Sequence, residues 1–338
     1  MARSTAEKNQ IPTRVATVRA SALALLVLGF AAVPATAGPP VTVQVTDGTL
    51  RVSGGPSADE IALRLSAADP DKLQVDVGDN GSADFAVDLA QFRVIEVTGG
   101  NGADTIRIDQ VNGAFTATET TRIGGGNGDD TLIGGSGAEV FTGGNGDDFV
   151  DGNGGVDTAF LGRGDDVFVW DPGDASDVVE GSRGSDTLIF NGSGAAETLA
   201  ATAEGGRVLF TRNLGNIVMD LNEVEVIDVR ALGGADAVTV NDVSGTDLDR
   251  VDVNLAATLG GSTADGLADV VSVAGTKGDD SIEVDAEGAV VEVAGLAAFV
   301  RISNTDPTLD ALVVNTEAGA DEVDVDPAVD GLVLVSVL

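Results

Sequence analysis

The stretch of sequence that decides the fold is residues 125–169, which read GGNGDDTLI GGSGAEVFT GGNGDDFVD GNGGVDTAF LGRGDDVFV. It divides without gaps into five units of nine residues, each with glycines among its first four positions and an acid in its sixth. The eighth residue of each unit is apolar: Leu132, Phe141, Val150, Ala159 and Phe168. A short fixed period of this kind predicts a solenoid, because each unit can bury its one apolar side chain only against neighbouring units.

Each unit begins with a glycine-rich turn whose composition suits a hard cation. We expect the glycines in the first, second and fourth positions to adopt positive φ, which lets the turn direct carbonyl oxygens inward. The sixth-position acid adds a carboxylate, and an all-oxygen shell favours Ca2+ over Mg2+, which demands octahedral geometry and retains its waters. The turn residues expected to line the ions are Gly125, Gly126, Asn127, Gly128, Gly143, Gly144, Asn145, Gly146 and Gly164.

The sixth-position acids are the expected carboxylate ligands. They are Asp104, Asp130, Glu139, Asp148, Asp157, Asp166, Asp177 and Asp186. Outside the five contiguous units, residues 99–107 (GGNGADTIR) and 181–189 (GSRGSDTLI) repeat the pattern. Residues 170–180 (WDPGDASDVVE) are two residues longer than a unit. The extra length predicts a β-bulge near Asp177.

These units resemble the calcium-binding nonapeptide of the RTX (repeats-in-toxin, hemolysin-type) proteins, GGxGxDxUx, where U is a large apolar residue. The resemblance implies a parallel β-roll in which two nonapeptides complete one coil. Turns 18 residues apart then stack on one edge and share an ion. On this basis Asp130, Asp148 and Asp166 lie on one edge, and Glu139 and Asp157 lie on the other.

The resemblance also implies where the ions lie. They are expected between the turns of Asp130 and Asp148, of Asp148 and Asp166, and of Glu139 and Asp157. The last pair departs from the family pattern, because Glu is longer than Asp and the glycines of residues 152–155 are shifted. No unit stands 18 residues before Asp130, so this residue is expected to end its row.

The chain begins with what we interpret as a secretory signal peptide, residues 1–37. Ala20–Val33 form an apolar run, and Ala35-Thr36-Ala37 fits a cleavage site. The run is too short to span a bilayer, and no other stretch is long enough. We therefore expect cleavage near Ala37, a mature protein without a transmembrane segment, and a location outside the cell or on its surface. The basic residues ahead of the apolar run are Arg3, Lys8, Arg14 and Arg19.

The chain is strongly acidic, and its charge excludes several classes of partner. Its 338 residues hold 55 acidic and 18 basic side chains, a formal net charge of -37. Nucleic acid is not an expected partner, because phosphate binding requires clusters of Lys and Arg. An anionic membrane surface is disfavoured for the same reason. The absence of Cys and His from the sequence excludes disulfides, thiolate metal sites and a Ser-His-Asp or Cys-His catalytic group within the chain.

The flanking regions carry a weaker form of the same pattern. An acid two residues before an apolar residue recurs there, and period-two alternation between these acids predicts half-buried strands. Two interpretations remain open: these acids bind calcium in longer coils, or they mark turns between strands. Gly278-Asp279-Asp280 is the first candidate among them for an ion. The acids concerned are Asp59, Asp236, Asp269, Asp280 and Asp321.

We predict an all-β fold, a parallel β-roll or β-helix solenoid with calcium-binding GGxGxD loops flanked by degenerate strand-rich repeats. After the signal peptide, residues 38–120 form an N-terminal strand-rich region with degenerate repeats. Residues 121–190 form the nonapeptide β-roll, and residues 191–338 form a strand-rich degenerate solenoid. The whole is expected to be one elongated body.

The predicted function is that of a secreted calcium-binding protein without catalytic activity, whose fold depends on Ca2+ shared between stacked loops. A structural or adhesive role outside the cell, with a cell-surface or extracellular polymer or protein as partner, suits the long repetitive faces of a solenoid. The alternative is a calcium-dependent enzyme acting on polysaccharide (a hydrolase, lyase or epimerase), since RTX repeats often follow enzyme domains and paired acids are plentiful. Aromatic residues for sugar stacking are scarce, at 4% of the chain.

Overall fold

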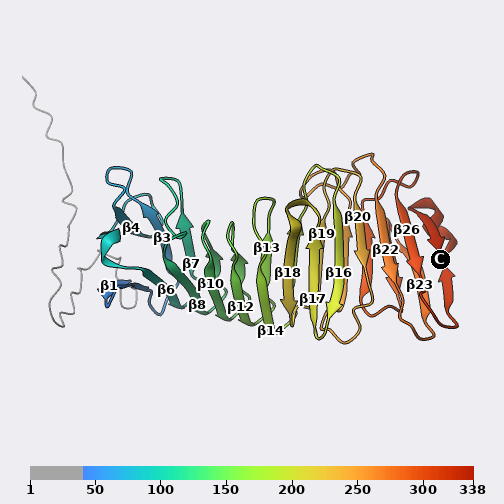
Figure 1. Cartoon of the computed structure of the whole chain (residues 1–338), viewed down its shortest axis with the longest axis horizontal. Coiled ribbons are helices and arrows are strands. Elements are labelled where there is room, and N and C mark those ends of the chain that lie inside the picture. Colours follow the sequence, from blue (N-terminus) through green and yellow to red (C-terminus); the bar gives the residue numbers. More distant parts are fainter. Residues whose placement is uncertain (1–40) are drawn as a thin grey trace, which may run out of the picture.

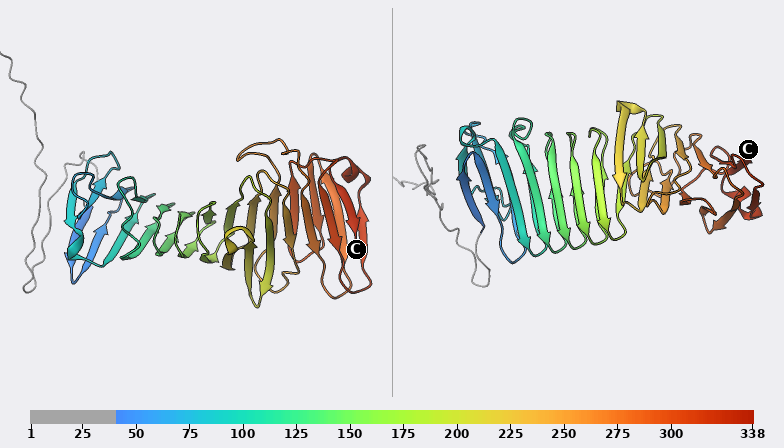
Figure 2. Two further views of the ribbon diagram at one scale, coloured as in Figure 1. Left: turned by 45° about the horizontal axis from the view of Figure 1, so that its top comes forward. Right: turned by 60° about the horizontal axis from the view of Figure 1, so that its bottom comes forward.

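Residues 41–338 are described by a computed structural model, and they wind into two β-sheets of fourteen strands each. Along most of the chain, consecutive strands alternate between the two sheets, so the sheets face each other along a rod (Figures 1 and 2). The predicted all-β parallel solenoid is confirmed. The predicted signal peptide lies outside the described residues.

We name the two sheets A and B and give their strands in spatial order. Sheet A contains β1 (Thr42–Thr46), β2 (Thr49–Ser53), β6 (Val94–Asn101), β8 (Thr120–Asn127), β10 (Glu139–Asn145), β12 (Thr158–Arg163), β14 (Val178–Arg183), β18 (Ile217–Asn222), β17 (Arg207–Arg212), β16 (Thr198–Glu204), β20 (Ala237–Val240), β22 (Val270–Ala274), β26 (Ala311–Asn315) and β28 (Leu334–Val337). Sheet B contains β27 (Glu322–Val325), β23 (Ser281–Glu287), β24 (Val290–Ala294), β25 (Phe299–Ser303), β21 (Arg250–Asn254), β19 (Val226–Arg230), β15 (Thr187–Asn191), β13 (Val167–Trp170), β11 (Phe149–Asp151), β9 (Thr131–Ile133), β7 (Thr105–Asp109), β3 (Glu60–Leu65), β4 (Lys72–Val77) and β5 (Phe85–Asp88). Three short 3-10 helices are η1 (Leu89–Gln91), η2 (Leu214–Asn216) and η3 (Pro327–Gly331).

The core of the repeat zone is a stack of the eighth-position side chains. In sheet B, Val150 is in parallel register with Leu132 on one side and Phe168 on the other. In sheet A, Phe141 is in register with Ala159. All five side chains are fully buried, as the nine-residue period predicts. Because each strand is only a few residues long, each coil relies on its two neighbours to cover this one side chain.

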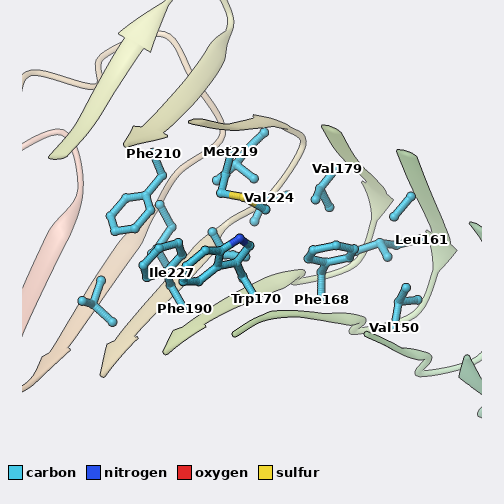
Figure 3. Packing of buried hydrophobic residues seen from close by; sticks show 14 of the residues in the cluster. Val150, Leu161, Phe168, Trp170, Val179, Phe190, Phe210, Met219, Val224 and Ile227 are labelled. Atoms are coloured by element: carbon cyan, nitrogen blue, oxygen red, sulfur yellow. The ribbon is translucent and has the colours of Figure 1, made fainter. Parts of the chain in front are cut away.

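The flanks continue the same solenoid with longer coils, and antiparallel hairpins widen it. Three-stranded meanders are inserted at β3–β4–β5, β16–β17–β18 and β23–β24–β25. The rod is narrow through its middle and taller toward the C-terminus (Figure 1). The hydrophobic core contains larger side chains where the rod widens. There Trp170 stacks on Phe190 with ring centroids 4.2 Å apart, and Phe190 contacts Phe210 edge-on (Figure 3).

The two extra residues in residues 170–180 do not form the predicted bulge. Strands β12 and β14 keep a regular parallel register, from Thr158 opposite Val178 to Arg163 opposite Arg183. The insertion lies instead in the turn between β13 and β14, where the Asp171 amide donates a hydrogen bond to the Asp174 carboxylate. A turn at the edge of a solenoid can lengthen into solvent without disturbing the sheet, and the prediction was wrong for that reason.

No helix among residues 41–338 is long and apolar enough to cross a membrane.

Candidate metal centre

The glycine-rich turns of the repeats line the two edges of the rod, where the chain passes from one sheet to the other. We call the turns that lead from sheet A to sheet B the first edge, and the turns that lead back the second edge. Asp130, Asp148 and Asp166 each precede a strand of sheet B and lie on the first edge. Glu139 is the first residue of β10 and Asp157 precedes β12, both strands of sheet A, and the two acids lie on the second edge. This is the distribution that the resemblance implied.

On the first edge the acids form a continuous run of hydrogen bonds, which we call the first-edge ladder. The backbone amide of Asp130 donates to Oδ1 of Asp148 at 2.8 Å, and the amide of Asp148 donates to Oδ1 of Asp166 at 2.7 Å. A bond from a backbone amide to the next carboxylate also links each of the remaining neighbouring pairs in the ladder. Its members are Asp59, Asp104, Asp130, Asp148, Asp166, Asp186 and Glu225.

Asp130 does not end this row, contrary to the expectation from sequence spacing. The amide of Asp104 donates to its Oδ1 at 2.7 Å although 26 residues separate the two. The additional residues lie between β7 and β8, on the second edge. The register between β6 and β8 is unaffected, and Gly100 is opposite Gly126. Counting residues could not reveal which edge of the coil had taken up the insertion.

The second edge carries a shorter ladder in the repeat zone. The amide of Glu139 donates to Oδ1 of Asp157 at 2.7 Å, and the amide of Asp157 donates to Oδ1 of Asp177 at 2.8 Å. The longer side chain of Glu139 fits because its Oε2 accepts a hydrogen bond from the Gly135 amide. In the preceding coil the position opposite Glu139 is Thr121, so this ladder begins at Glu139.

On the first edge the turn glycines follow the prediction in two of their three positions, whereas on the second edge Gly135 and Gly137 do not have positive φ. In the first full repeat, Gly126 and Gly128 have φ of 123° and 113°, and the equivalent Gly144 and Gly146 are similar. The first-position Gly125 does not have positive φ. Glycine is required at position 125 because a side chain would not fit: a Cβ there would lie 2.2 Å from Oδ2 of Asp130 in the same unit. The carboxylate therefore folds back over the start of its own turn.

Most of the repeat-zone acids use one carboxylate oxygen to accept a ladder bond, Glu139 uses one to accept the Gly135 amide, and seven of these acids leave the other oxygen buried without a partner. The sixth-position acids of the repeats are at most 2% exposed. Those whose second oxygen has no hydrogen-bond partner are Asp104, Asp130, Glu139, Asp148, Asp157, Asp166 and Asp186. Within residues 41–338, none of these seven acids forms an ion pair with Lys or Arg. A buried carboxylate without a compensating charge is costly, so these oxygens favour the binding of a cation.

The pKa values of the ladder acids are raised, as expected for buried carboxylates without a compensating charge. Burial, with the nearby charges of Asp166 and Asp130, raises the pKa of Asp148 from 3.8 to about 7. Burial and the charges of Glu139 and Asp177 raise the pKa of Asp157 to about 9. Both shifts have the same cause, which is the removal of a carboxylate from water beside other carboxylates. A bound cation would lower both pKa values, because it stabilises the charged carboxylates.

An ion in these ladders must also use backbone oxygens. Among residues 41–338, no three acidic side chains converge on one point. The turns stack closely enough to supply carbonyls, since a Cβ on Gly144 would lie 2.2 Å from the carbonyl oxygen of Gly126 in the preceding coil, and Gly164 meets Gly146 in the same way. The side chains of Asn127 and Asn145 bond to each other, with Nδ2 of Asn145 donating to Oδ1 of Asn127 at 2.7 Å. Carboxylates and carbonyls together form the all-oxygen shell that Ca2+ prefers.

The fifth-position acids form a separate, exposed ladder that the sequence analysis missed. The amide of Asp147 donates to Oδ1 of Asp129, and the amide of Asp165 donates to Oδ1 of Asp147, both at 2.9 Å. These carboxylates are open to solvent. The nine-residue period contained the signal, because it stacks the fifth positions as regularly as the sixth.

In the flanking regions, the first candidate for an ion, Asp280, already has a partner for each carboxylate oxygen. The backbone amide of Thr276 donates to Oδ2 of Asp280 at 2.8 Å, and the Thr276 hydroxyl donates to Oδ1 at 2.9 Å. The sequence analysis did not single out Glu197, Glu225 or Asp310, which the structure places in ladders. Each stands two residues before a buried apolar side chain, which is the same signal that marked the other acids.

Comparison with known families agrees with the geometry of the turns. The model of the RTX calcium-binding nonapeptide repeat (4 copies) matches residues 124–159, 133–168 and 171–189. These ranges contain the central part of the first-edge ladder and all of the second-edge ladder of the repeat zone. No curated protein matches the chain.

Proposed function

Starting from the RTX calcium-binding nonapeptide repeats that the chain carries between residues 124 and 189, we propose that it is a secreted structural or adhesive protein, without catalytic activity, whose fold depends on Ca2+. The observation that carries the proposal is the row of buried carboxylate oxygens without partners on the two edges. In a solenoid each coil relies on the next, so a cation between two turns stabilises every coil that depends on them.

Calcium would supply positive charge at the ladders, and the sixth-position carboxylates with nearby backbone carbonyls would hold it. The ladder bonds that Oδ1 of the Asp residues accepts keep consecutive coils in register. Without the ion, Asp148 and its neighbours in the ladder carry unpaired buried charge. Ion binding then contributes directly to folding, as in other small metal-organised modules.

A non-catalytic role is supported by how the acids are used. Oδ1 of each ladder Asp in the repeat zone is committed to a backbone amide, as with Asp148 and Asp166. An open depression beside the second edge, lined by Ile108, Gln110, Val111 and the turn residues 134–136 and 153–154, contains no acidic or basic side chain. The long repetitive outer faces of a solenoid instead suit contact with a partner surface.

Secretion is supported by the signal-like N-terminal sequence and by the chemistry of the sites. Extracellular calcium modules commonly have dissociation constants of about 10⁻⁴–10⁻³ M. In a calcium-poor cytosol the repeat zone would stay loose and only weakly stable, which suits passage through an export channel. Folding would follow in the calcium-rich exterior.

The test is circular dichroism of the purified chain with calcium and with EDTA. We expect the β signal and the melting temperature to fall together on chelation and to return with calcium, and unchanged values would contradict the proposal. The adhesive part is tested separately by retention of the protein on producing cells, with and without EDTA. Release of reducing sugar from extracellular polysaccharide would favour an enzyme instead.

A further inference from the structure

We propose that a calcium-class divalent cation also binds outside the nonapeptide repeats, at Asp236 on the second edge of the C-terminal zone. The site belongs to a run of hydrogen bonds that we call the C-terminal ladder. The amide of Glu197 donates to Oδ1 of Asp236 at 2.7 Å, the amide of Asp236 to Oδ1 of Asp269 at 2.8 Å, and the amide of Asp269 to Oδ1 of Asp310 at 3.0 Å. This is the bond pattern of the repeat zone, carried on coils more than 30 residues long.

The turn before Asp236 has the backbone of a nonapeptide turn without its sequence. Leu232 and Gly234 occupy the second and fourth positions of this turn, with φ of 68° and 135°. Leucine is an uncommon residue at positive φ, so the surrounding structure imposes this shape. A Cβ on Gly234 would lie 2.6 Å from the carbonyl oxygen of Ala195 in the preceding coil. The close carbonyl stacking of the repeats is thus present here as well.

The carboxylate of Asp236 lacks the partners that Glu197 and Asp310 of the same ladder have. Arg212 donates to Glu197 Oε1 from its Nε at 2.7 Å, in an ion pair that is buried on both sides. Oδ2 of Asp310 accepts a hydrogen bond from the Asp306 amide at 2.6 Å. Asp236 is 2% exposed, and its Oδ2 is buried with no hydrogen-bond partner.

Arg212 therefore supplies at Glu197 the positive charge that a metal ion supplies in the repeats. No Lys or Arg within residues 41–338 pairs with Asp236. The unpartnered Oδ2 is the same feature that marks the calcium ligands of the first-edge ladder.

The surroundings of Asp236 add negative charge. The amide of Gly234 donates to Oδ2 of Asp265 at 2.9 Å. In the repeats the equivalent amide, that of Gly128, donates to a backbone carbonyl instead. Burial, with the charges of Asp269, Glu197 and Asp265, raises the pKa of Asp236 to about 7. Carboxylate and carbonyl oxygens in an acidic setting favour Ca2+ among the common divalent ions.

The test is to count bound ions by native mass spectrometry of the full chain at graded concentrations of calcium chloride. We expect Asp236→Asn to bind one ion fewer than the wild type. The matched control is Asp280→Asn, which should bind as many as the wild type because both oxygens of Asp280 are already bonded within the chain. An unchanged ion count in Asp236→Asn would overturn the proposal.

Two further measurements separate this result from misfolding and from failure of the repeats. Calcium should slow hydrogen–deuterium exchange in β20 and β22 of the wild type and of Asp280→Asn, but not of Asp236→Asn, and equal slowing in all three would contradict the site. Asp148→Asn should lose ions while keeping the slowed exchange of β20 and β22. If Asp148→Asn loses no ion but Asp236→Asn does, the proposed function of the repeats fails and the site at Asp236 stands.

Discussion

Exchange of Asp148 for Asn should change stability in opposite directions with and without calcium. Asp148 lies at the centre of the first-edge ladder, and its Oδ1 accepts the Asp130 amide at 2.8 Å. Asn retains an oxygen for that bond and has almost the same shape. What the exchange removes is the negative charge on the buried, unpartnered Oδ2.

The magnitude follows from the pKa of this group in the metal-free fold. Burial and the charges of Asp166 and Asp130 raise it from 3.8 to about 7. At about 1.4 kcal/mol for each pKa unit this amounts to roughly 4 kcal/mol, and solvent screening at the edge of the rod reduces it to about 2–4 kcal/mol. Because the pKa is raised on folding, the folded state loses stability as pH rises through 7, so at pH 8 the full penalty applies.

The assay is thermal unfolding at pH 8, in EDTA and in millimolar calcium chloride. In EDTA, Asp148→Asn should melt roughly 5–10 °C above the wild type, because the penalty is gone. In calcium it should melt below the wild type and bind fewer ions, since a charged ligand is missing. The matched control is Asp129→Asn, an exposed fifth-position acid that should change little in either condition.

Two outcomes would refute this reasoning. If Asp148→Asn melts lower in EDTA by as much as in calcium, the carboxylate acts only through its hydrogen bond. If Asp129→Asn and Asp148→Asn lose calcium equally, the acids attract a diffuse ion cloud and the ladder sites do not exist.

Three other predictions follow from the same structure. The raised pKa values of the ladder acids favour protonation in the metal-free fold, so in EDTA the melting temperature should be highest near pH 4 and fall as pH rises through 6–7; a flat profile between pH 4 and 8 would exclude buried, unpaired carboxylates. Gly125→Ala should lower the free energy of unfolding by about 1–3 kcal/mol in urea, because its Cβ would collide with the ladder carboxylate, whereas Gly194→Ala enters open space and should change it by less than about 0.5 kcal/mol. Arg212→Met should lower the free energy of unfolding in urea by about 3–5 kcal/mol, because it leaves Glu197 buried and unpaired. The control Arg250→Met removes a more exposed ion pair and should lower it by at most about 1 kcal/mol. Comparable losses in the two variants would argue against a special role for the buried pair.

The flanks show how far a repeat pattern can be followed once it decays. Placing an acid two residues before an inward apolar residue was enough to mark Asp236, Asp269 and Asp280 as turn residues of a longer solenoid. It could not separate them by chemistry. Asp280 is satisfied by Thr276, four residues away, and Asp236 has no such neighbour.

The sequence by itself determined a solenoid with inward eighth positions, because a fixed nine-residue period lets each unit bury its one apolar side chain only against its neighbours. The parallel β-roll and the assignment of Asp130 and Glu139 to opposite edges came from the resemblance to the RTX nonapeptide, which implies two units in each coil. The tertiary structure alone decided that Asp104 continues the row of Asp130, because the residues between them can leave the coil on either edge at little cost. It alone decided that Arg212 neutralises Glu197, since the arginine arrives on a hairpin whose packing the local sequence does not specify. Local period dictates which side chains face inward, whereas the partner of a buried charge depends on which distant segment folds against it.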